Sequence, residues 1–304
     1  MANNFTDSKS LDGEGLSLYD ALIKHWSGVN DYTFATDEQI DNLFPPPPTL
    51  VSWSEGTDEE IINIIKSYYN NELTLDDIKT VWNVGDSREI NIEAIPNSGI
   101  GSYSESHSQQ TANLIIIDFD HDVLTTTIKN KNKALITVQL EYCLGGIGSL
   151  YDISEEYGPM NSTNSNTGGW ESCSRRNWCN TLFYNALPLY LKNTIKEVKK
   201  ISTIGNQSSS IIISSDKTFL LSEIETIGEV INSLAAEGTQ YNYYKKVDIK
   251  SKFRSDHIWL RSPHKSRETS ILPSDGYCSL YQGVSWNYCD NPMYSNGLMP
   301  AFCL

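Results

Sequence analysis

The chain has 304 residues, enough for about two domains of ordinary size, and its 39% hydrophobic content predicts a packed core. With 38 acidic and 23 basic residues its net charge is −15, which argues against binding nucleic acid or an anionic membrane. No run of 18 apolar residues occurs, and residues 1–15 lack the basic and apolar regions of a secretory signal. Neither a membrane span nor a signal peptide is therefore expected.

Residues 1–48 are interpreted as a helical attachment or oligomerisation segment. Apolar positions from Leu16 to His25 follow a short amphipathic pattern, and Thr36 is suited to cap a second short helix. The proline run Pro45–Pro48 is typical of a stiff spacer and so of a boundary, although an ordinary loop is an equal alternative.

Residues 49–80 are predicted to form a helical connector. Thr57 with Glu60, and Thr74 with Asp77, have the spacing of capping boxes, in which each side chain bonds the other residue's backbone amide. They predict a longer helix followed by a shorter one.

Residues 81–304 are predicted to form a domain that mixes helices and strands. Alternating or β-branched segments predict strands at 81–95, 114–119, 134–140 and 211–213, the last of them buried. Apolar spacing predicts helices at 172–184, from Pro188 to about Lys200, and at 220–234. A long loop is expected at 154–169, and short strands with ordered loops after His257.

The polar motifs do not indicate catalysis. Six cysteines in this length are too few for a disulfide scaffold, no known nucleotide or metalloprotease motif occurs, and a Cys173–Cys179 disulfide is not expected. Asp118, Asp120 and Asp122 could share one strand face and bind Ca²⁺ or Mg²⁺, but no further ligands are indicated. A solvated strand end is the preferred interpretation, so neither a metal nor a cofactor is predicted.

Two further features concern binding. The pair Arg175–Arg176 beside Trp178 could bind an anion, but structural pairing with an acidic surface of the protein is preferred. From Tyr241 onward there are seven Tyr and two Trp residues, which give large rigid contact areas. This concentration predicts a contact surface near the C-terminal end.

Several segments together resemble one family. They are Val84-Gly85-Asp86, Asp118 to Leu124, Gly168 to Trp178, Asn185 to Pro188, Glu237 to Tyr241, Trp259 to Pro263 and Gly297 to Cys303. From about Trp82 to Leu304 the chain resembles a domain of gut phage and prophage proteins that is similar to the C-type-lectin-like fold of formylglycine-generating enzymes. Variable proteins of diversity-generating retroelements, including a phage major tropism determinant, share this fold. The resemblance implies an α+β C-type-lectin-like fold with twisted antiparallel sheets and two main helices.

The resemblance also implies a variable region at about 257–304. In retroelement targets, adenines of a template are miscopied into the 3′ end of the gene. The residues encoded at those positions change, while the residues between them stay constant. The aromatic and polar residues there are suited to a contact surface; the alternative is that Trp286 and Tyr288 belong to the core. The predicted ligand-binding residues are His264, Lys265, Arg267, Glu268, Ser279, Tyr281, Trp286, Asn287, Tyr288, Asp290, Asn291, Met293 and Tyr294.

The sequence thus predicts a binding protein and not an enzyme. The expected role is a phage tail receptor-binding protein in the virion that recognises a protein or glycan on a cell surface. Its N-terminus would attach to tail or other structural proteins, and a homotrimer is expected from the resemblance. Calcium-dependent sugar binding is not expected, because Trp286-Asn287 is followed by Tyr288 and no Glu-Pro-Asn occurs. The alternatives are a bacterial surface display protein and a thiol oxidase using Cys278 and Cys289.

Overall fold

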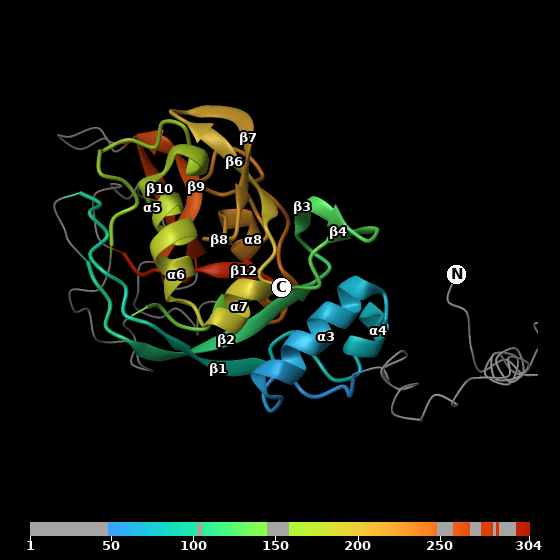
Figure 1. Cartoon of the computed structure of the whole chain (residues 1–304). Coiled ribbons are helices and arrows are strands. Elements are labelled where there is room, and N and C mark those ends of the chain that lie inside the picture. The colour runs from blue at the N-terminus through green and yellow to red at the C-terminus, as the bar shows by residue number, and fades with distance from the viewer. Residues whose placement is uncertain are drawn as a thin grey trace, which may run out of the picture. The chain divides into compact units, whose positions relative to one another are not determined.

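The computed structural model describes residues 48–101, 105–144, 158–247, 258–267, 275–281, 284–285 and 296–304 (Figure 1). The contacts along the chain divide it into two units, residues 1–47 and 48–304. Everything below concerns the second unit. The helices predicted from Leu16 to His25 and after Thr36 lie outside the described residues.

Two helices open this unit, α3 (Asp58–Asn70) and α4 (Leu75–Ile78), and both predicted capping boxes are confirmed. The Glu60 amide donates to the Thr57 hydroxyl, and the Glu60 carboxylate accepts the Thr57 amide at 2.8 Å. Trp53 and Trp82, on either side of the helices, are fully buried and pack edge to face with ring centroids 5.3 Å apart. Residues 49–80 therefore contribute to the hydrophobic core and do not merely connect two parts.

The largest sheet has five antiparallel strands in the order β1-β2-β5-β12-β8. Their bounds are β1 (Ser87–Ile92), β2 (Gln110–Phe119), β5 (Ile136–Leu140), β12 (Ala301–Cys303) and β8 (Thr218–Phe219). The strands predicted at 114–119 and 134–140 are confirmed as β2 and β5. The last strand of the chain, β12, pairs with β5 on one side and β8 on the other.

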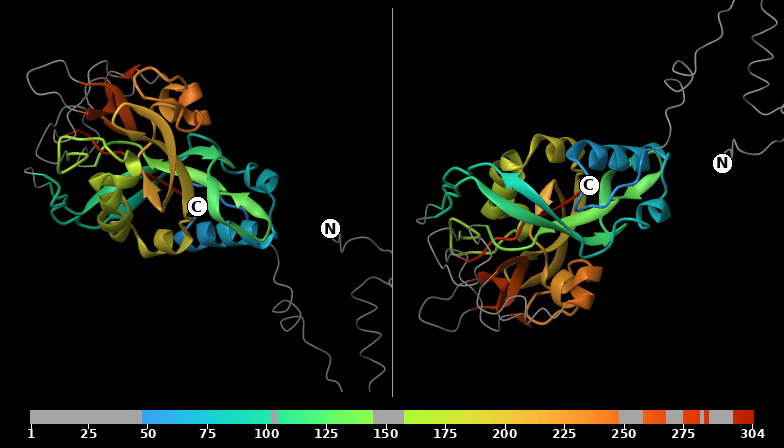
Figure 2. Two further views of the ribbon diagram at one scale, coloured as in Figure 1. Left: turned by 90° about the horizontal axis from the view of Figure 1, so that it is seen from above. Right: turned by 90° about the horizontal axis from the view of Figure 1, so that it is seen from below.

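Two smaller antiparallel sheets complete an α+β fold. One has the order β4-β3-β6-β7, with β4 (Lys131–Lys133), β3 (Val123–Ile128), β6 (Val198–Gly205) and β7 (Ser208–Asp216). The other has the order β11-β10-β9, with β9 (Ile258–Arg267), β10 (Asp275–Tyr281) and β11 (Val284–Ser285). The five-stranded sheet lies between α3 on one side and β9 and β10 on the other (Figure 2).

The remaining helices are short. The helix predicted at 172–184 is confirmed as a continuous run of α5 (Ser174–Trp178), the π-helical η2 (Cys179–Phe183) and α6 (Tyr184–Ala186). The short η1 (Trp170–Ser172) precedes it, separated by the extended residue Cys173. The others are α7 (Leu189–Thr194), α8 (Glu223–Ile227) and α9 (Asn242–Lys246). No helix of the described residues is both long enough and apolar enough to cross a membrane.

Two of the helix predictions are too long. The helix expected from Pro188 to Lys200 ends at Thr194, and residues from Val198 onward form β6, paired with β7. Hairpin pairing has overridden a weak helical pattern there, so Lys200 lies on a strand and not at a helix terminus. The helix predicted at 220–234 is only α8, which ends at Gly228, a residue in the left-handed conformation with φ of 87°.

The prediction of a buried strand at 211–213 is half wrong. These residues do form part of β7, but β7 lies at the edge of its sheet. Ile211 is 47% exposed and Ile213 is 59% exposed. A run of apolar residues indicated burial on both faces, whereas the strand is covered on only one.

The phenol of Tyr69 provides a test of how α3 is joined to the sheet. Its hydroxyl donates to the Leu304 carbonyl and accepts from the Leu135 amide, each at 3.1 Å and each buried. Tyr69→Phe leaves the Leu135 amide without this partner, so we expect the free energy of unfolding to fall by about 1–3 kcal/mol in urea denaturation.

The matched control is Tyr68→Phe, because the neighbouring hydroxyl makes neither of these two bonds. An equal decrease in the free energy of unfolding in the two variants would contradict a specific role for the Tyr69 hydroxyl.

Candidate functional site

The segment that carries most of the predicted contact residues begins and ends at one junction. The Trp259 amide donates to the Gly297 carbonyl at 3.0 Å, and Ile258 forms a parallel bridge with Gly297. The Trp259 indole N–H donates to the Gly158 carbonyl at 2.8 Å. We call this meeting of residues 258–263 and 296–300 the closing junction.

The returning side of the closing junction is bonded to the five-stranded sheet. The amides of Leu140 and Leu144 donate to the carbonyls of Pro300 and Leu298 at 3.1 and 3.0 Å. The Gln139 amide side chain donates to the Met299 carbonyl at 3.1 Å. Residues 296–304 are all buried, so this end has no freedom to move without disrupting the core.

The departing side is held by Arg261, which is fully buried on β9. Its guanidinium donates to both carboxylate oxygens of Glu225, and also to the carbonyls of Leu220 at 3.0 Å and Glu237 at 2.7 Å. Burial alone would raise the pKa of Glu225, but the charges of Arg261 and Lys200 lower it below its usual value. Glu225 is therefore ionised and bonds β9 to α8.

Lys200 extends this cluster to a third element. Its ammonium lies 2.7 Å from Asp122 Oδ1, 2.8 Å from Glu225 Oε1 and 3.0 Å from the Tyr241 hydroxyl, which in turn donates to Asp122 at 2.9 Å. Burial would raise the pKa of Asp122, but Lys200 and His121 lower it well below its usual range. We call Asp122, Lys200, Glu225, Tyr241 and Arg261 the buried charge network.

The three aspartates that were considered as metal ligands have different partners. Asp118 accepts from the backbone and side-chain amides of Asn242 at 2.9 and 2.8 Å, and Asp122 belongs to the buried charge network. Asp120 lies 3.7 Å from Lys133 at the surface. The preferred interpretation of a solvated strand end is wrong for Asp118 and Asp122, which are buried because they bond other elements. Among the described residues, no three His, Cys, Asp or Glu side chains are arranged to hold a metal ion.

The structure locates five of the thirteen predicted contact residues. Lys265 is exposed, and Arg267 and Tyr281 lie on β9 and β10. The prediction of a surface position is wrong for His264 and Ser279, which are 2% and 0% exposed. Ser233 forms a bridge with His264 and so covers this part of β9, while Ser279 pairs with Trp259 in the interior. The other predicted contact residues lie outside the described residues: Glu268, Trp286, Asn287, Tyr288, Asp290, Asn291, Met293 and Tyr294.

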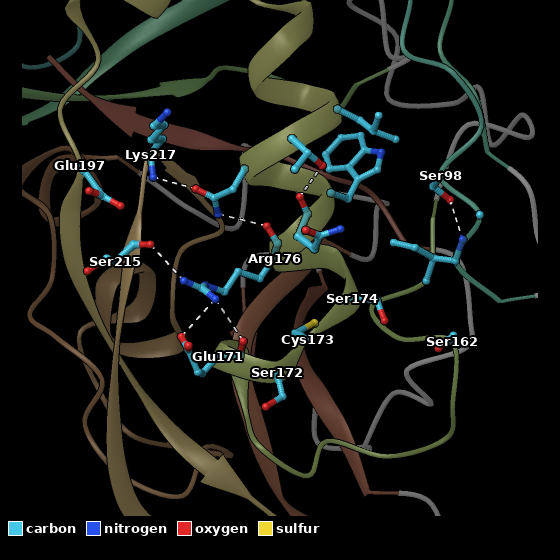
Figure 3. A pocket seen from close by; sticks show the side chains of 17 residues that line it. Ser98, Ser162, Glu171, Ser172, Cys173, Ser174, Arg176, Glu197, Ser215 and Lys217 are labelled. Carbon is cyan, nitrogen blue, oxygen red and sulfur yellow. Dashed lines mark hydrogen bonds and ion pairs between the residues drawn. The ribbon is translucent and has the colours of Figure 1, made fainter.

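A polar groove of about 820 Å³, which sequence reasoning did not predict, runs along α5 and η2 (Figure 3). Arg176 lies at its centre, between Glu171 and Ser215. Its guanidinium donates to the Glu171 carbonyl at 3.1 Å and the Ser215 carbonyl at 3.0 Å, and bonds Asp216 at 2.6 Å. Burial raises the pKa of the Cys173 thiol, which also lines the groove, so this thiol is not an activated nucleophile. The groove offers hydrogen bonds to a ligand but no evident catalytic group among the described residues.

The two arginines of the Arg175–Arg176 pair both bind acidic side chains of the protein, as preferred from the sequence. Arg175 forms an ion pair with Glu105 at 2.6 Å, and both side chains are fully buried. The acidic partners Glu105 and Asp216 are thus interior groups and not an acidic surface. The anion-binding alternative has no free guanidinium to support it at Arg176, whose donors face Glu171, Ser215 and Asp216.

Residues 129–304 match the family model described as a domain of unknown function (DUF6273). The match spans more than half of the chain, so the protein belongs to this family. It includes Lys200, Glu225, Arg261 and both sides of the closing junction, while Asp122 precedes it. No curated protein matches the chain, and no solved structure matches it.

Neighbouring lysines on β6 test the buried charge network. Lys200 is buried between two carboxylates, whereas Lys199 is exposed on the opposite face of the strand. Lys200→Met leaves Asp122 and Glu225 without their shared cation, and we expect it to lower the free energy of unfolding by about 3–5 kcal/mol. Lys199→Met should change it by no more than about 0.5 kcal/mol.

Urea denaturation followed by tryptophan fluorescence measures both variants. Similar losses at the two positions would show that the Lys200 ammonium does not compensate the buried carboxylates.

His107 gives a pH prediction. Burial and the nearby Arg175 lower its pKa from 6.5 to about 4 in the folded protein. As the pH falls from 6.5 to 4, the unfolded chain binds a proton at this site and the folded chain does not. The free energy of unfolding should therefore decline over this range by up to about 1.4 kcal/mol per pH unit because of His107 alone.

His107→Gln should remove this contribution, so the difference between wild type and variant should change between pH 6.5 and 4 and stay constant from pH 7 to 8. His121→Gln is a control whose effect on the free energy of unfolding should depend on pH with the opposite sign. Burial lowers the pKa of His121, but Asp122 raises it above its usual value overall, so His121 stabilises the fold below pH 6.5 and less above it. A pH-independent difference for His107→Gln would contradict a buried neutral imidazole.

Proposed function

We propose that the protein is a ligand-recognition protein that displays an exchangeable C-terminal segment on a rigid frame. One observation carries the proposal. The closing junction fixes both ends of the segment between Pro263 and Asn296, through buried backbone bonds on one side and the buried charge network on the other. Exposed residues between two fixed ends can be exchanged without moving the frame, whereas buried ones such as Tyr277 and Ser279 belong to the frame.

The energetics support this division of roles. Substitutions at exposed positions usually change the free energy of unfolding by less than about 0.5 kcal/mol, whereas breaking a buried charged pair lowers it by about 3–5 kcal/mol. Arg261 and Trp259 belong to the second class, since both are buried and bonded to other elements. The proposed contact surface consists of Lys265, Arg267, Glu268, Tyr281, Trp286, Asn287, Tyr288, Asp290, Asn291, Met293 and Tyr294.

In this proposal the fold is C-type-lectin-like and the chain resembles the variable proteins of diversity-generating retroelements. The α+β architecture with antiparallel sheets, and a C-terminal strand that inserts between β5 and β8 of the main sheet, are compatible with it. The role that fits best is a phage tail protein of the virion that binds a protein or glycan receptor on a bacterial surface. The 1–48 segment would attach it to the tail, and a homotrimer would add avidity to a weak single site.

Population sequencing tests the proposal. If a retroelement exchanges residues of the segment, the gene amplified from a mixed population should vary at the codons of the eleven proposed surface positions. The varying nucleotides should correspond to adenines of a near-repeat template. Codons of the frame, such as Trp259, Arg261 and Gly297, serve as the control within the same reads and should stay constant.

Variation spread evenly over the gene, or a C-terminal segment as constant as the frame, would contradict the proposal. An exposed position outside the segment, such as Lys199, distinguishes targeted exchange from ordinary drift, because drift would vary its codon as much as that of the exposed Lys265.

A further inference from the structure

Strand β7 presents an edge without the usual protection. It is the last strand in the order β4-β3-β6-β7, and within the described ranges no strand pairs with its outer side. Edge strands carry unpaired backbone groups, and proteins commonly protect them with charged residues or proline. Residues 208–215 are Ser-Ser-Ser-Ile-Ile-Ile-Ser-Ser and contain neither. At one end of this edge the Arg176 guanidinium donates to the Ser215 carbonyl at 3.0 Å, so the unprotected part is residues 208–214.

One face of this strand is apolar and exposed. Ile211 and Ile213 are two residues apart and so share a face, and Ile201 on β6 lies directly opposite Ile213. All three are exposed, and we call them the isoleucine patch. The strand cannot turn this face inward, because its other face is fixed by Asp216, which accepts the buried Trp170 indole N–H at 3.1 Å.

The sequence of the edge is a palindrome. Residues 209–215 are Ser-Ser-Ile-Ile-Ile-Ser-Ser, the same in both directions about Ile212. An antiparallel partner related by a two-fold axis at Ile212 would place Ile211 opposite Ile213 of the second copy, and serine opposite serine. The two isoleucine patches would then join into one continuous strip across the paired strands.

Charge favours the same partner. Each chain carries a net charge of −15, so two copies repel each other over most of their surface. No residue from 208 to 215 is charged, and the exposed side chain opposite Ser215 on β6 is the cation Lys199. The β7 edge is therefore a place where two copies can approach without acidic groups facing one another.

We propose that β7 pairs antiparallel with β7 of a second copy of this chain, about a two-fold axis at Ile212. The pairing completes the unpaired edge and buries the isoleucine patch of both copies. It goes beyond the proposed recognition function and does not depend on it. If the chain also forms the proposed homotrimer, the pairing joins two trimers, so loss of the pairing halves the mass of the assembly in either case.

The mass of the assembly in solution tests this proposal. Ile213→Lys places a charge at the centre of the interface, so the mass measured by light scattering should fall to half that of the wild type. Leu189→Lys is the matched control, because Leu189 is 69% exposed on α7, away from the β7 edge. Its mass should equal that of the wild type, and circular dichroism checks that both variants are folded.

Crosslinking gives an independent measurement should Ile213→Lys fail to fold. Facing residues of an antiparallel pair have Cα atoms about 4.5–5.5 Å apart, within the range of a disulfide. Ile212→Cys should therefore form a disulfide-linked dimer on oxidation, well above the level of the wild type and of Leu189→Cys. Unchanged mass in Ile213→Lys, no excess crosslink at position 212, or a polydisperse series of wild-type aggregates would each overturn the proposal.

Discussion

The arrangement of the unit depends on the pairing of two buried cations with two buried carboxylates. Lys200 on β6 bonds Asp122 and Glu225, and Arg261 on β9 bonds Glu225 from the other side. A charged group removed from water costs several kcal/mol unless it is paired and fully hydrogen-bonded. The elements that carry these groups therefore have one low-energy arrangement, and β6, α8 and β9 are placed relative to one another by it.

This constraint explains how both ends of the segment between Pro263 and Asn296 are held in place. Apolar contacts are non-directional and allow neighbouring elements to slide, whereas the bidentate bond of Arg261 to Glu225 fixes both distance and orientation. The hydrogen bond from Trp259 to Gly297 then sets where the segment returns. Rigidity at the closing junction comes from directional bonds, and the proposed exchange of residues concerns only positions beyond it.

Local signals in the sequence predicted local structure well. The capping boxes at Thr57 and Thr74 involve residues three apart, and both helices begin where predicted. Strands β2 and β5 followed from β-branched runs and alternation. The prediction failed at Lys200, because spacing that suited a helix also suited an alternating strand. The overlooked signal was the turn at Gly205 and Asn206, whose positive φ values of 69° and 48° close the β6–β7 hairpin.

Long-range features were beyond the reach of these patterns. Asp122, Lys200 and Arg261 are far apart in the sequence, and no spacing rule brings them together. The backbone bridge of His264 to Ser233, 31 residues earlier in the chain, was likewise not indicated by any local pattern. The segments that carry the family resemblance contain Asp122, Tyr241 and Arg261, but the resemblance did not indicate that these residues meet.

The position of β12 has a consequence for the biosynthesis of the protein. Strand β8 joins the five-stranded sheet only through β12, which lies between β5 and β8. A chain that ends before Gly297 lacks β12, so the facing edges of β5 and β8 stay unpaired. The sheet can therefore be completed only after residues 301–303 have been synthesised, and a truncated chain exposes two strand edges that favour aggregation.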